Sequence, residues 1–309
     1  MAVDSPIQPD GPPAMRVPGS RVAGYLLEEA VGGGRLAMVF RARDESLGRT
    51  VALKLLPWKP GSGGGFVGEA QVMAAVDHPN ILPVYGAGVA DGYEFIAMRF
   101  VTGEALDAVI RREGRLSARR AVGYLSPVAS ALDAAHSAGL VHRDVKPANI
   151  LMDSRPGGSA HVYLSDFGLA TVVQSADKLT EPGQFVGTVS YASPEQFTGG
   201  PVDGRADQYS LACVTYQLLT GSVPFGEDQV EEIMYRHLSL PPPPLRSERP
   251  DLPSAVDRVL AKAMAKAPED RYDSCVSFVD ALREALGVEP YDPGQSAVET
   301  AAPRQVTGP

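Results

Sequence analysis

The chain has 309 residues, of which 44% are hydrophobic, and its formal net charge is -9. This apolar fraction is that of an ordinary globular protein, and the length is enough for two lobes. The acidic balance and the absence of a run rich in lysine and arginine argue against a nucleic-acid partner. No run reaches the roughly 18 apolar residues of a membrane span. The two cysteines, Cys213 and Cys275, lie too far apart for a zinc site or a disulfide framework. We therefore expect a cytoplasmic protein with no membrane segment in this chain.

The first third of the chain has mostly strand-like patterns. Residues 1–20 are rich in proline and glycine and lack the apolar core of a signal peptide, so we expect a disordered arm there. Five strand-like runs follow, at residues 25–31, 37–43, 50–55, 82–86 and 93–101. Between them, residues 66–76 place their apolar side chains on one helix face. Residues 21–100 are thus expected to form a small lobe of five strands and one helix.

Helical patterns dominate from Leu106 onward. Residues 117–139 predict a long amphipathic helix, with Ser117 as its N-cap and Gly139 as its stop. The apolar run 207–220 predicts a buried helix. Three further helices are expected at residues 231–238, 254–266 and 274–286.

Two segments of this second part are expected to lack helices. The four prolines Pro241–Pro244 favour an extended linker. Residues 289–309 are rich in proline and alanine and show no periodic pattern, so we expect a disordered tail.

A glycine-rich turn separates the first two strand-like runs. In Val31-Gly32-Gly33-Gly34, backbone N–H groups could approach phosphate oxygens with no side chain in between. Alone, this motif is more typical of an ordinary hairpin turn. One strand later, however, Lys54 stands in an apolar run, and lysine is rarely buried without a partner. Nucleotide phosphates and Glu69, on the expected helix, are its candidate partners, and a solvated surface pair is the alternative.

The most informative stretch is His142-Arg143-Asp144-Val145-Lys146-Pro147-Ala148-Asn149, which precedes a second acidic turn, Asp166-Phe167-Gly168. These residue types suit the transfer of a phosphoryl group to a hydroxyl. Asp144 can orient the hydroxyl and take its proton, and Lys146 can neutralise charge on the moving phosphoryl group. Asn149 and Asp166 supply hard oxygen ligands for magnesium. The alternative is a pair of polar turns in a loop-rich region.

Over residues 25–287 the chain resembles a bacterial serine/threonine protein kinase of the eukaryotic-like, Hanks type. The glycine-rich turn, Lys54, Glu69, the Asp144 stretch and the Asp166 turn occur in the order of that family. The resemblance implies an α+β, bilobal protein kinase fold. A small antiparallel β lobe with one helix would occupy residues 21–100, and a larger, mainly helical lobe would occupy 103–288. It also implies ATP and Mg²⁺ or Mn²⁺ as cofactors, protein substrates, and a homodimer that autophosphorylates in trans.

The resemblance implies a nucleotide site. Gly32 and Gly34 would cover the phosphates, and Lys54 would contact the α- and β-phosphates and pair with Glu69. Met98 resembles the gatekeeper. The adenine would be bound by the backbone of Arg99 and Val101 and enclosed by Val31, Val39, Ala52 and Leu151.

Two residues depart from the family pattern. Ala37 replaces the third glycine of the loop, and its methyl group limits positive φ, which is expected to loosen the loop. Arg99 replaces the usual acidic residue, but binding there uses the backbone.

The resemblance also implies which residues carry out phosphoryl transfer. Asp144 would be the catalytic base, and Asn149 and Asp166 would hold the magnesium ions. Asp-x-Lys-Pro-x-Asn is typical of serine/threonine kinases, so Lys146 favours Ser or Thr acceptors over tyrosine. Thr188 would bond Asp144 and Lys146 and shape the substrate site.

Residues 187–195 resemble the end of an activation segment, with Ser193 where alanine is usual. Glu195 would pair with Arg271. Asp207, which opens the buried helix as a candidate N-cap, would hold the catalytic-loop backbone.

Arg143 predicts regulation by phosphorylation. In kinases of this kind, a phosphorylated activation-loop residue neutralises the arginine beside the catalytic base. The candidates are Thr171, Ser175 and Thr180, of which we favour Thr180.

Two other interpretations remain open at this point. A pseudokinase that binds nucleotide or acts as a scaffold usually lacks the equivalent of Lys54, Asp144 or Asp166, and all three are present here. A kinase for small molecules is disfavoured by the segment 188–195.

Overall fold

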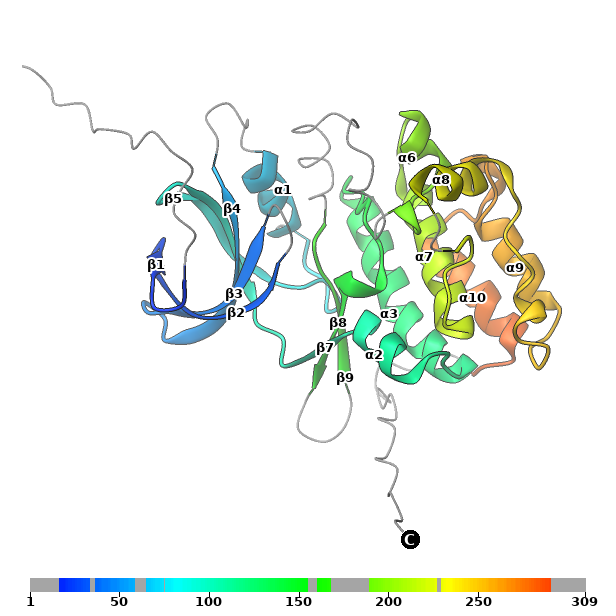
Figure 1. Ribbon diagram of the computed structural model, residues 1–309, viewed down its shortest axis with the longest axis horizontal. Coiled ribbons are helices and arrows are strands. Elements are labelled where there is room, and N and C mark those ends of the chain that lie inside the picture. The colour runs from blue at the N-terminus through cyan, green and yellow to red at the C-terminus, as the bar shows by residue number, and fades with distance from the viewer. Residues whose placement is uncertain are drawn as a thin grey trace, which may run out of the picture. The chain divides into compact units, whose positions relative to one another are not determined.

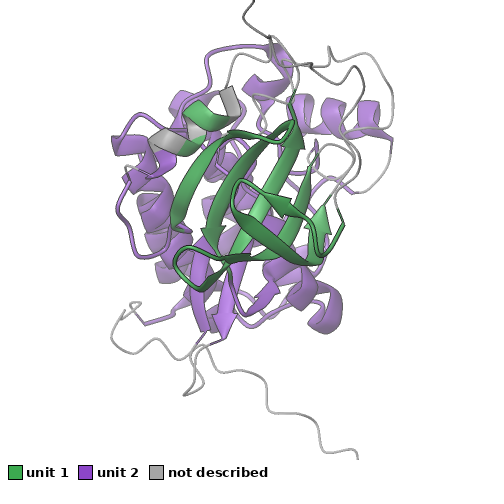
Figure 2. Cartoon of the chain, turned by 90° about the vertical axis from the view of Figure 1, so that its left-hand side faces the viewer, with its two compact units in different colours: residues 1–71, 83–100 green, residues 72–82, 101–309 purple. Residues whose placement is uncertain are grey.

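The computed structural model describes residues 17–33, 37–58, 65–74, 76–154, 160–167, 189–226 and 229–289. The chain divides into two compact units, shown in Figure 2. Unit 1 comprises residues 1–71 and 83–100, and unit 2 comprises residues 72–82 and 101–309. Most of the predicted arm and tail lies outside the described residues.

Unit 1 contains a six-stranded antiparallel sheet in the order β1-β2-β3-β4-β6-β5 (Figure 1). The strands are β1 (Arg21–Val22), β2 (Tyr25–Gly33), β3 (Met38–Asp44), β4 (Arg49–Pro57), β5 (Val84–Ala90) and β6 (Tyr93–Arg99). All five predicted strands are present. β1 was not predicted, because two residues are too few to show an alternating pattern.

Alternation along the strands builds the core of unit 1. Phe40 and Ala42 on β3, and Val51, Leu53 and Leu55 on β4, are buried on one face of the sheet. Residues i and i+2 of a strand share a face, so the intervening residues of β3 and β4 point to the other face. The predicted helix is α1 (Gly65–Ala74), in which Ala70 and Met73 are buried.

Unit 2 contains a small antiparallel sheet in the order β7-β8-β9, which the sequence analysis did not predict. Its strands are β7 (Gly103–Ala105), β8 (Ile150–Ser154) and β9 (Ala160–Leu164). At Gly103 an added Cβ would lie 1.8 Å from the carbonyl oxygen of Met152, so only glycine allows β7 to approach β8 this closely. β8 begins directly after Asn149, and β9 ends two residues before Asp166.

The rest of unit 2 is mainly helical, as predicted. The helices are α2 (Leu106–Glu113), α3 (Ala118–Ser137), α6 (Pro194–Thr198), α7 (Gly204–Thr220), α8 (Val230–Ser239), α9 (Ala255–Ala263) and α10 (Cys275–Leu286). Short 3-10 turns lie at Pro147–Asn149, Leu245–Ser247 and Pro268–Asp270. The helices α3, α7 and α10 pack side by side (Figure 1). Among the described residues, no helix combines the length and apolar character needed to cross a membrane.

Helix ends follow the predicted caps, with one exception. The Ser117 hydroxyl accepts a hydrogen bond from the backbone N–H of Arg120, and Gly139 after α3 has a φ of 78°. The expectation that Asp207 opens its helix is wrong. α7 begins three residues earlier, at Gly204, because Asp203 is the cap and accepts from the Arg205 N–H at 2.8 Å. Asp207 is left within the first turn and buried.

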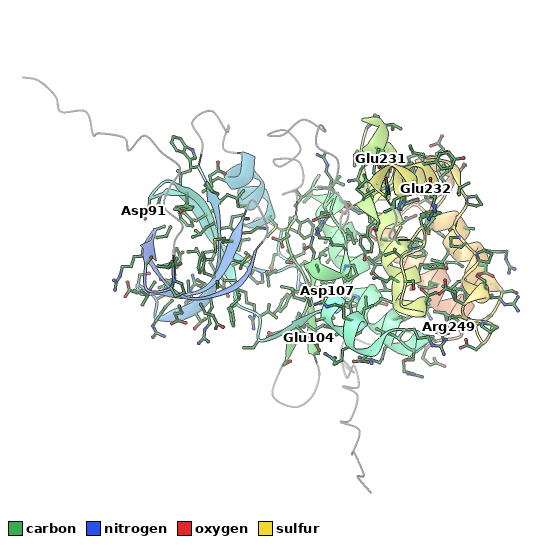
Figure 3. All side chains as sticks on the ribbon, in the orientation of Figure 1. Asp91, Glu104, Asp107, Glu231, Glu232 and Arg249 are labelled. Carbon is green, nitrogen blue, oxygen red and sulfur yellow. The ribbon has the colours of Figure 1, made fainter. Side chains whose placement is uncertain are left out.

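A buried arginine links two segments of unit 2 that lie far apart in the sequence. Arg249, labelled in Figure 3, lies in the segment after the turn Leu245–Ser247. Its Nη1 donates to the carbonyl oxygens of Leu219, at 2.7 Å, and Leu116, at 3.3 Å. The end of α7 and the start of α3 are thereby held together through satisfied carbonyl groups.

Candidate active site

One buried carboxylate holds the segment His142–Asn149, called here the Asp144 loop. Asp207 on α7 is fully buried. Its Oδ1 accepts the backbone N–H of Arg143 at 2.7 Å, and its Oδ2 accepts that of His142 at 2.8 Å. Hydrogen bonds to an ionised acceptor are among the stronger ones in proteins. The prediction that Asp207 holds this backbone is confirmed.

His142 fixes the inner side of the Asp144 loop. Its ring is fully buried and lies 4.5 Å from the ring of Phe167. Nδ1 accepts the backbone N–H of Asp144 at 3.2 Å, so Nε2 carries the proton and donates to the carbonyl oxygen of Ser165 at 2.9 Å. This imidazole therefore ties the Asp144 loop to the turn that carries Asp166.

The polar residues of the loop converge on Asp144. Lys146 Nζ lies 2.7 Å from Asp144 Oδ2. Asn149 Nδ2 donates to the same oxygen at 3.1 Å and to the backbone carbonyl of Asp144 at 2.8 Å. All three predicted residues are thus brought together, with the Asp144 and Lys146 side chains 17% and 23% exposed. A carboxylate in this position is held in one orientation and remains accessible.

Asp166 stands beside Asn149 because of a buried serine. Ser165 donates both its backbone N–H, at 2.9 Å, and its hydroxyl, at 3.2 Å, to the carbonyl oxygen of Asn149. Asp166 itself has a left-handed backbone, with φ of 63°. Aspartate tolerates this conformation better than most residues. The two predicted metal ligands therefore come from adjoining turns.

A second set of residues, on α3, supports the Asp207 carboxylate. His136 on α3 donates from Nε2 to Asp207 Oδ2 at 2.7 Å, and its Nδ1 lies 3.8 Å from Asp133. Burial lowers the pKa of His136, but the hydrogen bonds to Asp133 and Asp207 outweigh it and raise that pKa to about 9. Asp133 also accepts the backbone N–H groups of Cys275 and Val276, each at 2.9 Å.

Asp133, His136 and Cys275 are residue types that bind metals, and their ligand atoms lie within 4.8 Å of one another. The hydrogen bonds described above already account for the grouping. Both oxygens of Asp133 cap α10, and the histidine joins the two carboxylates. We assign the group to support of the loop.

In unit 1, several residues predicted to contact nucleotide share one face of the sheet. Gly32 lies opposite Val39, Val39 opposite Lys54, and Ala52 opposite Met98. Directly opposed residues share a face, and so do Ala52 and Lys54, which are two apart on β4. This is the face away from the buried cluster of Phe40 and its neighbours.

Comparison with known proteins decides the family. A family model for the protein kinase domain matches residues 25–281. The chain belongs to the protein kinase family. The family predicted from the motifs is therefore confirmed.

The curated relatives compared here are named serine/threonine-protein kinases. PknJ of Mycobacterium tuberculosis is 42% identical over 275 residues, which are 87% of this chain and 46% of the relative. PknF of M. tuberculosis is 40% identical over 275 residues, 87% of this chain and 58% of the relative. PknE of Mycobacterium bovis is 39% identical over 278 residues, 89% of this chain and 48% of the relative. The chain thus spans about half the length of the curated relatives it matches.

The predicted ion pair between Glu195 and Arg271 is present in unit 2. Arg271 makes a two-pronged contact with Glu195, with N–O distances of 2.7 and 2.9 Å, and both residues are buried. The same guanidinium donates to three backbone carbonyl oxygens, those of Arg205, Ala265 and Lys266. A fully paired guanidinium of this kind fixes the start of α6.

The remaining predicted site residues lie in either unit or outside the described residues. Arg99 ends β6 in unit 1, and Leu151 on β8 and Val101 belong to unit 2. Val31 lies at a bulge of β2 and is 46% exposed. Gly34, Thr188 and the phosphorylation candidates Thr171, Ser175 and Thr180 lie outside the described residues, as does the side chain of Glu69 on α1.

A close backbone approach occurs in the described part of the glycine-rich turn. Gly33 is the position that requires glycine, because a Cβ there would lie 2.9 Å from the carbonyl oxygen of Ala37. The expectation that Ala37 loosens the loop stays a prediction, because residues 34–36 lie outside the described residues.

Several residues that support the site were not predicted from the sequence. His142, Ser165 and Asp133 act mainly on backbone groups of segments distant in sequence. Spacing along the chain carries no signal for such bonds. Only the position of His142 inside the recognised motif pointed to it.

Proposed function

We propose that this chain is an ATP-dependent serine/threonine protein kinase, which transfers the γ-phosphoryl group of ATP to Ser and Thr hydroxyls of proteins. The observation that carries the proposal is the convergence of Lys146 and Asn149 on the Asp144 carboxylate. The names of the mycobacterial relatives, serine/threonine-protein kinases, support serine and threonine as acceptors.

Asp144 acts on the acceptor hydroxyl. Its Oδ2 already accepts from Lys146 and Asn149, which leaves Oδ1 for the hydroxyl. The hydroxyl oxygen forms a bond to the γ-phosphorus while the bond from that phosphorus to the bridging oxygen breaks and ADP leaves. The hydroxyl proton passes to Asp144. Positioned bases of this kind contribute about 10²- to 10⁴-fold, and Lys146 balances charge on the moving group.

Asn149 and Asp166 suit a hard divalent cation, Mg²⁺ or Mn²⁺. Asn149 uses its amide nitrogen for both bonds to Asp144, so its amide oxygen is the atom left to act as a ligand. Asp166 supplies a carboxylate from the adjoining turn, and oxygen ligands match these ions. Such an ion, when bound, neutralises the phosphate oxygens.

Nucleotide contacts follow from the family resemblance. Lys54 would contact the α- and β-phosphates and pair with Glu69, and Gly32 and Gly34 would cover the phosphates. The remaining adenine contacts would come from Val31, Val39, Ala52, Arg99, Val101 and Leu151. The common face of Gly32, Val39, Ala52 and Lys54 supports this set.

Regulation and location are further parts of the proposal. Thr188 would bond Asp144 and Lys146, and Thr180 would be autophosphorylated in trans within a homodimer in the cytoplasm. Arg143 next to the base motivates the phosphorylation site. Full activity of Thr180→Ala after complete dephosphorylation would exclude Thr180.

The test is a phosphorylation assay with labelled ATP. The purified chain is incubated with Mg²⁺ or Mn²⁺, alone and with a generic protein substrate, beside the Asp144→Asn variant. Label on Ser or Thr that the variant does not produce supports the proposal. No label from either protein indicates a pseudokinase, and label only on a small molecule indicates a small-molecule kinase.

A further inference from the structure

Arg143, next to the proposed base, has a backbone conformation that must be held from outside. Its φ is 64°, in the left-handed region. For a residue with a long side chain this conformation is unfavourable, and it persists only where the surroundings enforce it. Because Asp144 is the next residue, the direction of its carboxylate depends on this turn.

Two helices hold the backbone of Arg143, one at each polar group. Asp207 on α7 accepts the N–H at 2.7 Å. Gln196 on α6 donates from Nε2 to the carbonyl oxygen at 2.9 Å. The first of these contacts was expected from the sequence, and the second was not.

The amide of Gln196 has a defined orientation. Its Oε1 accepts the backbone N–H of Ser193 at 3.0 Å and the Ser193 hydroxyl at 3.1 Å. Since a backbone N–H can only donate, the oxygen must face Ser193 and the NH₂ group must face Arg143. Ser193, which departs from the usual alanine, is fully buried and gains a partner in this way.

The start of α6 is itself anchored, because the neighbouring Glu195 is paired with Arg271. A continuous set of contacts therefore runs from this buried ion pair through Gln196 to Arg143 and Asp144.

We propose that Gln196 is a positioning residue of the kinase reaction. It holds the carbonyl of Arg143 and thereby keeps the Asp144 carboxylate in the direction that phosphoryl transfer needs. Through Ser193 it also makes that direction depend on the end of the activation segment. This inference rests on the kinase activity proposed above.

Two substitutions test the role of Gln196. Gln196→Met keeps the length and removes both polar atoms, and Gln196→Glu keeps the shape but places an oxygen against the Arg143 carbonyl. The matched control is Thr198→Ala, on the exposed side of the same helix. We expect both Gln196 variants to lose about ten- to a hundredfold in kcat, as small misplacements of catalytic groups do. The KM for ATP should change little, and the control should match the wild type.

The pH dependence of the Gln196→Glu variant separates positioning from folding. Once protonated, the introduced carboxyl group regains a donor toward the Arg143 carbonyl. The activity of Gln196→Glu relative to Gln196→Met should therefore rise as the pH falls from about 8 toward about 5. Wild-type kcat in both variants would overturn the proposal. So would a loss explained entirely by a smaller folded fraction, with unchanged kcat per folded molecule.

A readout independent of activity keeps the two proposals apart. Amide hydrogen exchange of the Asp144 loop should be faster in Gln196→Met than in Thr198→Ala, because the Arg143 backbone loses one of its two anchors. If the wild type is inactive but exchange accelerates, the proposed kinase activity fails and the positioning contact stands. If exchange is unchanged, the positioning role is wrong.

Discussion

A single buried carboxylate, that of Asp207, holds the Asp144 loop in place. Asp207 accepts bonds from two backbone N–H groups and from His136, and it has no exposed surface. A buried carboxylate is tolerable only when such partners compensate for lost water. Its isosteric amide is therefore a poor substitute, although it has the same shape.

Asp207→Asn is expected to destabilise the chain by about 3 kcal/mol, because an NH₂ group would face donors that then lack an acceptor. Asp203→Asn is the matched control. Asp203 is the exposed cap of the same helix, and asparagine caps helices equally well. Urea denaturation of the two variants gives the comparison, and equal unfolding midpoints would contradict the role assigned to Asp207.

The buried pair of Arg271 and Glu195 gives a second prediction, which concerns stability. Arg271→Met leaves Glu195 buried and unpaired, which is expected to cost about 3–5 kcal/mol of stability. The exposed pair Arg111–Asp107 serves as a comparison, since Arg111→Met should cost less than about 1 kcal/mol. Adding Glu195→Gln to Arg271→Met should recover part of the loss. A double-mutant cycle with no coupling would show that the pair is not structural.

Among the secondary-structure elements, the packing of α7 against α3 decides where Asp207 lies. Gly204, the first residue of α7, sits against the ring of His136 on α3. An added Cβ would lie 2.5 Å from His136 Nδ1. This close approach lets His136 reach Asp207, and it explains why a helix former is absent at this position.

Gly204→Ala should therefore destabilise the chain by about 1–3 kcal/mol, because the methyl group must displace the ring or the helix. Gly200→Ala is the control, since its nearest new contact would be an ordinary 3.7 Å. Thermal unfolding measured side by side would reveal the difference. A neutral Gly204→Ala would mean that α7 can shift without cost.

For the whole molecule, two histidines make opposite contributions to the pH dependence of the free energy of unfolding. His136 faces Asp133, Asp207 and Cys275, and its pKa is raised from 6.5 to about 9. His237 is fully buried, bonds the Tyr209 hydroxyl at 2.9 Å and faces Lys266. Burial and the charge of Lys266 lower the pKa of His237 to about 3.

The signs follow from which state binds the proton more tightly. Stabilisation from His136 is complete below pH 6.5 and is lost as the pH rises through about 9. Stabilisation from His237 is complete above pH 6.5 and is lost as the pH falls toward about 3. Urea midpoints across this range should show a smaller alkaline loss in His136→Asn and a smaller acid loss in His237→Gln, each relative to wild type. Parallel profiles in all three proteins would refute the assignment.

Patterns along the chain predicted the family, the division into two parts and the residues that we propose for phosphoryl transfer. These follow from local patterns: the alternation of Val51, Leu53 and Leu55, the cap at Ser117, and the fixed spacing of Asp144, Lys146 and Asn149. Such signals depend on neighbours within a few residues, so they can be read along the chain.

Tertiary contacts fix how those residues are held. The donors and acceptors on which the Asp144 loop depends come from Asp207 and Gln196, more than fifty residues away along the chain. Most of their partners are backbone groups, which every residue possesses, so no residue pattern records the pairing. For the same reason the sheet of β7, β8 and β9 was not predicted. The cap of α7 is a local feature, and it lies at Asp203 rather than at Asp207, where the apolar run begins. Burial and backbone direction, which exist only in the folded chain, select which polar groups meet.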